Sequence, residues 1–338
     1  MSVKRLKVIY TGGTLGMLPG PQGLEPAPGF ANRLCQALPD NWLSNNRLQL
    51  DFLELDPPLD SSAMQPRHWF QLAALARQAE DKVQGIVILQ GTDTLAWTAS
   101  ALHWLLPEIS CPLLVTAAQK PLNTPSSDAL SNIQQALLWA SQPDLTGVYL
   151  NFHHQLFDPR HCRKQDAQAM DAFANPRGQA LARFRQPLPS ITAPSFPQAL
   201  NFQLTIQQLQ YLSEHFQARI LRLPLIPGLD ASYLAKLTDS LDGLLLEGLG
   251  AGTSPPLREF YTALKKHKVI TGMLTQCWSG QVSHDYAASA EARQAGVVNL
   301  GAGTPENAQA SLTWLLALRQ LKFVPDQKIP FLWQEACM

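Results

Sequence analysis

Residues 8–14 read Val-Ile-Tyr-Thr-Gly-Gly-Thr, and residues 86–94 read Ile-Val-Ile-Leu-Gln-Gly-Thr-Asp-Thr. Each segment is an apolar run followed by glycine and threonine, the pattern of a buried strand that ends in a tight turn. In open α/β sheets, ligands bind outside the carboxyl ends of the strands. The two segments therefore predict a parallel sheet that presents two threonine hydroxyls, one of them beside a carboxylate, at its ligand-binding edge.

Strand and helix patterns alternate around these segments. This alternation predicts an α/β fold whose mostly parallel sheet is covered by helices on both faces. The first half of the chain has strand patterns at Leu6–Thr11, Leu48–Leu53, Val83–Gln90, Leu113–Ala117 and Gly147–Phe152. Helix patterns lie between them at Pro66–Asp81, Thr94–Leu106 and Ser127–Ser141.

A proline-rich stretch without periodicity follows at residues 185–199 and predicts a linker between two domains. We expect an N-terminal catalytic domain at 1–184, a linker region at 185–215 and a smaller C-terminal α/β domain at 216–338. The tail from Phe323 has two prolines and no clear period, so no element is predicted there. The second series has strand patterns at Arg219–Leu223, Gly243–Leu246, Val269–Leu274 and Val297–Leu300, and helix patterns at Asp230–Asp239, Pro256–His267, Asp285–Ala295 and Pro305–Leu321.

Charge and composition exclude several classes of partner. Lys+Arg and Asp+Glu both number 26, so nothing favours nucleic acid or an anionic membrane as a ligand. No apolar stretch approaches the ~20 residues of a membrane span, and the N-terminus lacks the features of a signal peptide. The five cysteines are odd in number and widely spaced, which favours reduced thiols and a cytoplasmic location.

Taken alone, each threonine motif has a plain structural explanation. A Gly-Gly-Thr after a strand is usually a tight turn, and Thr-Asp-Thr is typical of a helix N-cap. Both motifs occur here together, in one order, with further matching segments. They resemble the L-asparaginase family, most closely its cytoplasmic type I branch, and the matching segments are Thr11–Thr14, Leu59–Ser62, Gly91–Thr94, Gln119–Leu122, Arg163–Lys164, Asp171–Pro176 and Thr275–Cys277.

The resemblance implies a two-domain fold and the hydrolysis of L-asparagine to L-aspartate and ammonia through an acyl-threonine intermediate. It assigns catalytic roles to Thr14, Thr92, Asp93 and Lys164. Thr, Lys and Asp are a chemically sufficient set, since a lysine held by a carboxylate can take the proton from a hydroxyl nucleophile. Substrate contacts are expected from Asp60, Ser61, Ser62, Thr92 and Asp93.

The family needs neither cofactor nor metal, and none is expected here. His153, His154 and His161 fit no standard zinc spacing. Members of the family assemble as homodimers or homotetramers, so a homo-oligomer is the expected state, with a small amino acid as the substrate and no nucleic acid or membrane partner.

Leu24 and Glu247 are among the positions that depart from the family pattern. Leu24 stands where a mobile lid usually carries a tyrosine that bonds the first threonine. In type I enzymes with a second, activating asparagine site, an arginine occupies the position of Glu247. We therefore expect at most a remnant of that site at Glu247, Thr275, Gln276 and Cys277.

Two alternatives to an asparaginase remain. One is an amidohydrolase that prefers glutamine or accepts a broader range of amides. The other is a non-catalytic amino-acid-binding relative that has lost turnover. A glutamyl-tRNA amidotransferase subunit shares the motifs, but the neutral charge and the lack of an N-terminal extension disfavour it.

Overall fold

The computed structural model describes residues 3–193, 196–283 and 285–338. The chain divides into two compact units, Met1–Glu214 and His215–Met338. Among the described residues, no helix is both long enough and apolar enough to cross a membrane.

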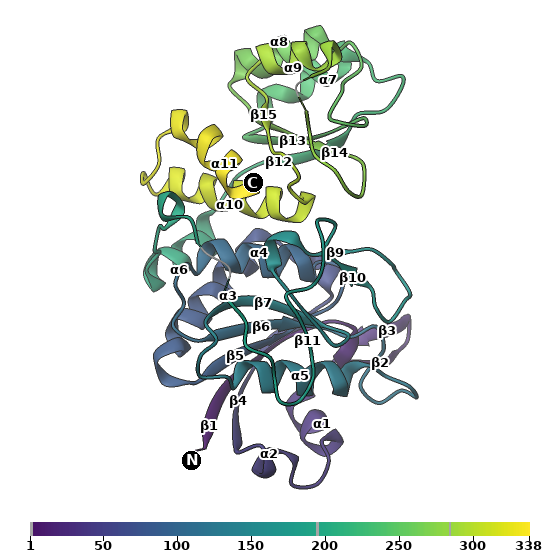
Figure 1. The fold of residues 1–338 in the computed structure, drawn as a ribbon, viewed down its shortest axis with the longest axis vertical. Coiled ribbons are helices and arrows are strands. Elements are labelled where there is room, and N and C mark those ends of the chain that lie inside the picture. Colours follow the sequence, from purple (N-terminus) through teal and green to yellow (C-terminus); the bar gives the residue numbers. More distant parts are fainter. Residues whose placement is uncertain (1–2, 194–195, 284) are drawn as a thin grey trace. The chain divides into compact units, whose positions relative to one another are not determined.

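A seven-stranded sheet forms the centre of the first unit, in the order β11-β8-β7-β6-β5-β1-β4 (Figure 1). The strands from β7 to β4 in this order are parallel, and β8 and β11 add an antiparallel edge. The predicted parallel sheet is therefore confirmed. Its strands are β1 (Lys4–Gly12), β4 (Leu48–Leu59), β5 (Gly85–Leu89), β6 (Pro112–Thr116), β7 (Gly147–Phe152), β8 (Gln155–Phe157) and β11 (Ala182–Arg183).

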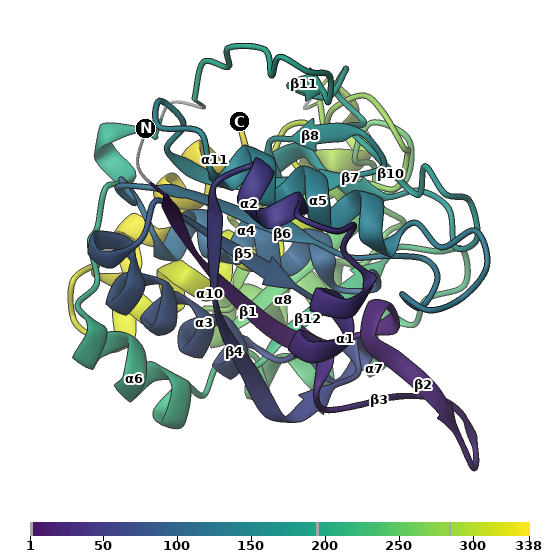
Figure 2. The ribbon, with the colours of Figure 1, turned by 90° about the horizontal axis from the view of Figure 1, so that it is seen from below.

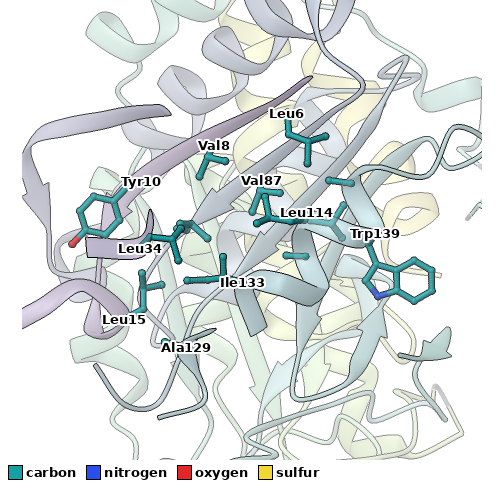
Figure 3. Close-up of a cluster of buried hydrophobic side chains, with 14 of the residues drawn as sticks. Leu6, Val8, Tyr10, Leu15, Leu34, Val87, Leu114, Ala129, Ile133 and Trp139 are labelled. Carbon is teal, nitrogen blue, oxygen red and sulfur yellow. The ribbon is translucent and has the colours of Figure 1, made fainter. Parts of the chain in front are cut away.

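Helices cover both faces of this sheet. Helices α3 and α4 lie on one face and α5 on the other (Figure 1). The α5 face encloses a core of buried apolar side chains, among them Val8, Val87, Leu114 and Ile133 (Figure 3). The helices are α1 (Phe30–Ala37), α2 (Trp42–Asn45), α3 (Pro66–Ala79), α4 (Leu95–Leu105), α5 (Ala129–Ala140) and α6 (Ile206–His215).

Smaller elements complete the unit. Strands β2 (Met17–Gly20) and β3 (Gly23–Pro26) form an antiparallel hairpin, and β9 (Arg163–Lys164) pairs antiparallel with β10 (Phe173–Ala174). Residues 185–215, predicted as a linker, contain α6. Short 3₁₀ turns are η1 (Thr14–Gly16), η2 (Ser61–Ala63), η3 (Glu80–Lys82), η4 (Pro159–His161) and η5 (Gln198–Leu200).

The order of the strands reverses at β1. From β1 the chain passes to β4 on one side, and then returns to β5 on the other side of β1. Such a switch point leaves a crevice at the carboxyl ends of the strands, where α/β proteins bind ligands. The segments that follow β1, β4 and β5 therefore meet at one place on the sheet edge.

Two glycines allow these segments to approach closely. Gly13 has φ 84°, and a side chain there would overlap the backbone nitrogen of Gly91. A side chain at Gly91 would come within 2.6 Å of the Ser61 hydroxyl oxygen. The backbones of the first and third of these loops are therefore in direct contact, and the Ser61 side chain packs against Gly91, which only glycine at both positions permits.

The second unit has a four-stranded parallel sheet in the order β12-β13-β14-β15. Helices α7, α8 and α9 cover one face, and α10 and α11 cover the other (Figure 1). Its strands are β12 (Ile220–Pro224), β13 (Gly243–Gly248), β14 (Ile270–Thr275) and β15 (Val298–Asn299). Its helices are α7 (Ala231–Leu237), α8 (Arg258–His267), α9 (Ala290–Gln294), α10 (Pro305–Gln320) and α11 (Ile329–Cys337), with 3₁₀ turns η6 (Thr238–Ser240), η7 (Ala287–Ser289) and η8 (Asp326–Lys328).

The C-terminal tail is more ordered than the sequence predicts. It forms η8 and then α11, whose Trp333 is fully buried. The expectation of no element after Phe323 was wrong because Pro330 lies in the first turn of α11. Proline is tolerated there, since a first-turn N–H has no partner inside the helix. The helix predicted at Asp285–Ala295 is shorter than expected and begins at Ala290.

A buried polar cluster joins α4 to η4. His103 and His161 lie beside Asp158 and Arg160, and Arg160 binds the Asp158 carboxylate through Nε and Nη2 at 3.1 and 2.7 Å. Burial lowers the pKa of His103 to about 3 and that of His161 to about 4. Burial alone would raise the pKa of Asp158, but the hydrogen bonds and charge of Arg160 outweigh it and lower the pKa to about 2. The folded protein therefore keeps both histidines neutral under mildly acidic conditions.

This cluster predicts loss of stability under mild acid. An unfolded histidine takes up a proton as the pH falls through about 6.5, whereas folded His103 and His161 do so only near 3 and 4. The unfolded state then binds more protons, so the free energy of unfolding falls by about 2 kcal/mol per histidine between about pH 7 and pH 5. Asp158 adds its own loss only at lower pH. Denaturant titrations across this interval measure the effect, and an unchanged midpoint would contradict it.

The contact at Gly13 predicts an intolerant position. Gly13→Ala adds a methyl group against the Gly91 backbone at a positive φ, and we expect it to destabilise the first unit by about 2–3 kcal/mol or more. Gly178→Ala is the matched control, because a methyl group there meets no atom within 4 Å. Thermal melts compare the two variants, and equal melting temperatures would show that the loops can move apart at no cost.

Candidate active site

Lys164, Thr92 and Asp93 are in direct contact. The Lys164 ammonium donates hydrogen bonds to Thr92 Oγ1 and to Asp93 Oδ1, both at 2.8 Å. Thr92 is buried and follows β5, whereas the Asp93 side chain is 62% exposed. A hydroxyl, an amine and a carboxylate therefore share one hydrogen-bonded unit, which is what a nucleophile and its base require. The sequence places Lys164 seventy-two residues from Thr92, and the fold brings them together.

A short ribbon rather than the main sheet holds Lys164. Lys164 lies opposite Phe173 in the β9–β10 pair, and the Phe173 ring packs on Phe152 at a centroid distance of 4.8 Å. Phe152 is the last residue of β7. This aromatic contact ties the ribbon to the carboxyl end of a central strand, so Lys164 projects toward the same edge as Thr92.

Thr14 comes from the loop that follows β1. It begins the turn η1 directly after Gly13, and it is half-buried. The next residue, Leu15, accepts a hydrogen bond from the Leu122 N–H at 2.9 Å through its carbonyl. Because Gly13 packs against Gly91, the loop that carries Thr14 lies against the loop that carries Thr92.

Asp60, Ser61 and Ser62 occupy the corresponding loop after β4. Asp60 Oδ1 accepts hydrogen bonds from both the N–H and the hydroxyl of Ser62, each at 2.8 Å. Ser61 is buried beside Gly91, and its carbonyl accepts a hydrogen bond from Thr94 Oγ1 at 2.8 Å. The predicted site residues after β1, β4 and β5 thus share one sheet edge with Lys164.

Leu24 lies on β3 within the β2–β3 hairpin, and its side chain is 51% exposed. Figure 2 shows this hairpin extending away from the body of the first unit. Tyr10 does not supply the hydroxyl that Leu24 lacks. Its ring is buried and stacks on Phe30 at 4.6 Å, its hydroxyl donates to the Ala27 carbonyl, and burial raises its pKa to about 12.

The predicted remnant site lies at the carboxyl ends of β13 and β14 in the second unit. Glu247 is buried there and accepts two hydrogen bonds from Arg222, at 3.0 and 2.7 Å, on its Oε1 atom. Gln276 Nε2 donates to the Glu247 carbonyl at 2.7 Å, while Thr275 Oγ1 accepts from the Cys277 N–H at 3.0 Å. The four residues named from the sequence are therefore neighbours.

Two residues that contact these groups received no role from the sequence. Thr94 ends the second threonine motif and begins a predicted helix, yet its hydroxyl donates to the Ser61 carbonyl. Arg222 lies within the strand pattern Arg219–Leu223. The available signal was its charge inside the otherwise apolar run Ile220-Leu221-Arg222-Leu223, since a charge on a strand that packs against a core favours a neutralising partner.

Comparison with known proteins identifies a family for most of the chain. The family models described as "Asparaginase, N-terminal" and "Glutaminase/Asparaginase C-terminal domain" match residues 5–194 and 219–322. L-asparaginase 1 of Escherichia coli K12 is 30% identical over 94% of this chain and 93% of its own length. The 60 kDa lysophospholipase of Mus musculus is 31% identical over 96% of this chain, which spans only 61% of that protein.

A solved structure shares the fold. L-asparaginase I from Vibrio cholerae superposes with a TM-score of 0.79 at 27% identity, covering 98% of this chain and 97% of that one. The two-domain α/β fold and the family resemblance drawn from the sequence are confirmed by these matches. The chain belongs to the asparaginase family of amidohydrolases.

Proposed function

We propose that this protein is an L-asparaginase that hydrolyses the side-chain amide of L-asparagine to L-aspartate and ammonia. The observation that carries the proposal is the 2.8 Å hydrogen bond between Lys164 Nζ and Thr92 Oγ1, with Asp93 on the same ammonium. A threonine needs such a partner to act in covalent catalysis, because its hydroxyl is a weak nucleophile.

The proposed reaction has two steps. One threonine hydroxyl, from Thr14 or Thr92, attacks the carboxamide carbon, and its proton passes to Lys164 in the amine form. The amino group of the tetrahedral intermediate then takes this proton from Lys164 and leaves as ammonia, and an acyl-threonine ester remains. Water next attacks the ester carbon, and its proton returns to the threonine oxygen as aspartate leaves. Asp93 orients the lysine through its short ion pair.

The same edge offers groups for both charges of the amino acid. The exposed carboxylate of Asp93 can accept hydrogen bonds from the substrate ammonium. We assign Asp60, Ser61 and Ser62 to the α-amino and α-carboxylate groups, which need fixed acceptors and donors. The hydrogen bonds within this loop give it a defined shape before substrate arrives.

Glutamine is the second candidate substrate, favoured by the "Glutaminase/Asparaginase" description of the C-terminal match. Ammonia release by the purified protein with asparagine and then with glutamine decides between the two. Release from neither, together with retained amino-acid binding, would instead support a non-catalytic relative. A homo-oligomeric state and a cytoplasmic location stay predictions, and light scattering after gel filtration tests the first.

Substitutions in the hydrogen-bonded unit should abolish turnover. We expect Thr92→Val and Lys164→Met each to lower kcat by about 10³-fold or more, because each removes one half of the nucleophile–base unit. Thr14→Val should have a comparable effect. Lys82→Met is the control, since Lys82 is an exposed lysine in η3. A variant that folds and keeps near wild-type kcat would remove its residue from the mechanism.

Saturation by asparagine should follow a simple hyperbola. Arg222 already donates two hydrogen bonds to the Glu247 carboxylate. The carboxylate of an effector asparagine would have to displace Glu247 from Arg222 in order to bind there. Allosteric activation requires an effector that binds one conformational state of the protein more tightly than another. The Arg222–Glu247 ion pair leaves no group that would give asparagine this difference in affinity. Initial rates over a wide range of asparagine concentration test the expectation. A sigmoidal curve whose steepness changes in Glu247→Gln would contradict it.

A further inference from the structure

Thr94 is an N-cap residue that does not cap its helix. It precedes α4, yet its side chain makes no capping hydrogen bond. A threonine at this position ordinarily accepts a hydrogen bond from an N–H of the first turn. The Thr94 hydroxyl instead donates to the Ser61 carbonyl at 2.8 Å, across to the loop after β4. The Thr94 side chain therefore connects the start of α4 to the loop after β4.

Gln90 fixes the direction of this hydroxyl. Its Nε2 donates to Thr94 Oγ1 at 3.0 Å, so Thr94 must direct its own proton elsewhere. Gln90 is only 1% exposed, and its backbone N–H donates to the Thr116 carbonyl at 3.0 Å, which ties it to the neighbouring strand β6. Its Oε1 has no hydrogen-bond partner within the described part of the chain. A reversed Gln90 amide would accept the Thr94 proton and leave Ser61 without this donor.

The chain of hydrogen bonds from Gln90 through Thr94 ends on the loop of Asp60, Ser61 and Ser62. The Ser61 carbonyl receives a second bond from the Met64 N–H at 3.2 Å, and the Ser61 side chain lies against Gly91. Thr94 is two residues from Thr92. The bond to Ser61 therefore links the loop after β4 to the segment that carries the reacting hydroxyl.

We propose that Thr94 is a positioning residue, which holds the loop of Asp60–Ser62 at a fixed distance from Thr92 and Asp93 so that substrate is bound in register with the nucleophile. This inference rests on the proposed asparaginase function. In this view Thr94 determines where substrate is placed, whereas Thr92 and Lys164 carry out the chemistry. A shift of the loop should weaken substrate binding first, because Lys164 and Thr92 remain in contact.

Three variants test the proposal. Thr94→Val removes the hydroxyl at nearly constant volume, and Thr94→Ser retains it. Thr98→Val is the matched control, because Thr98 is a fully buried threonine one turn along α4, whose Oγ1 accepts a hydrogen bond from Trp69 Nε1 at 3.1 Å. KM and kcat for asparagine are measured for each variant. Amide hydrogen exchange of Ala63 and Met64, whose N–H groups bond Asp60 and Ser61, reports the loop directly.

We expect Thr94→Val to raise KM about tenfold or more with a smaller change in kcat, and to accelerate exchange at Ala63 and Met64. Thr94→Ser should restore both values, and Thr98→Val should alter neither, whatever its melting temperature. A KM within twofold of wild type, unchanged exchange in Thr94→Val, or the same changes in Thr98→Val would overturn the proposal. If the wild-type protein releases no ammonia from either amino acid, the proposed function fails, and the exchange measurement alone decides the positioning role.

Discussion

The contact between the Gly13 and Gly91 backbones is the constraint on which the site depends. Two strands that are neighbours at the switch point of the sheet must deliver their loops to one place, and a side chain at either glycine would hold those loops apart. The Ser61 side chain, from the loop that follows β4, packs against Gly91 as well. The separation of the two threonine loops is therefore set by main-chain packing. Backbone contacts of this kind do not change with rotamers, so the site is preorganised before any ligand binds.

The sequence predicts which strands end at the ligand-binding edge of the sheet, because the patterns that mark strand ends are local. The apolar runs that end at Gly12 and Gly91 identify strands, and a parallel sheet necessarily collects their carboxyl ends. The position of Lys164 could not be read in this way. It depends on a two-residue ribbon and on the packing of Phe173 against Phe152, a contact between distant segments that no periodicity records. Only resemblance to a known family pointed to this lysine.

Other features were missed for equally physical reasons. The helix α11 was missed because it contains Pro330, which its first turn accommodates. The pairing of Arg222 with Glu247 joins adjacent strands whose alignment is a property of the folded sheet. Glu247 is not a solvated strand end, because it is buried and accepts two hydrogen bonds from Arg222. The charge of Glu247 is balanced by the Arg222 guanidinium. The net charge at this end of β13 is therefore that of the ion pair and not that of Glu247 alone.

The ribbon that carries Lys164 also has a consequence for how this scaffold could diversify. Its two strands are joined by residues 165–172, and Gln165, Asp166, Ala167 and Gln168 are exposed. A connection of this kind can change in length or composition without disturbing the aromatic anchor beneath it. Lys164 would then keep its place beside Thr92 while one exposed turn varies in length and composition.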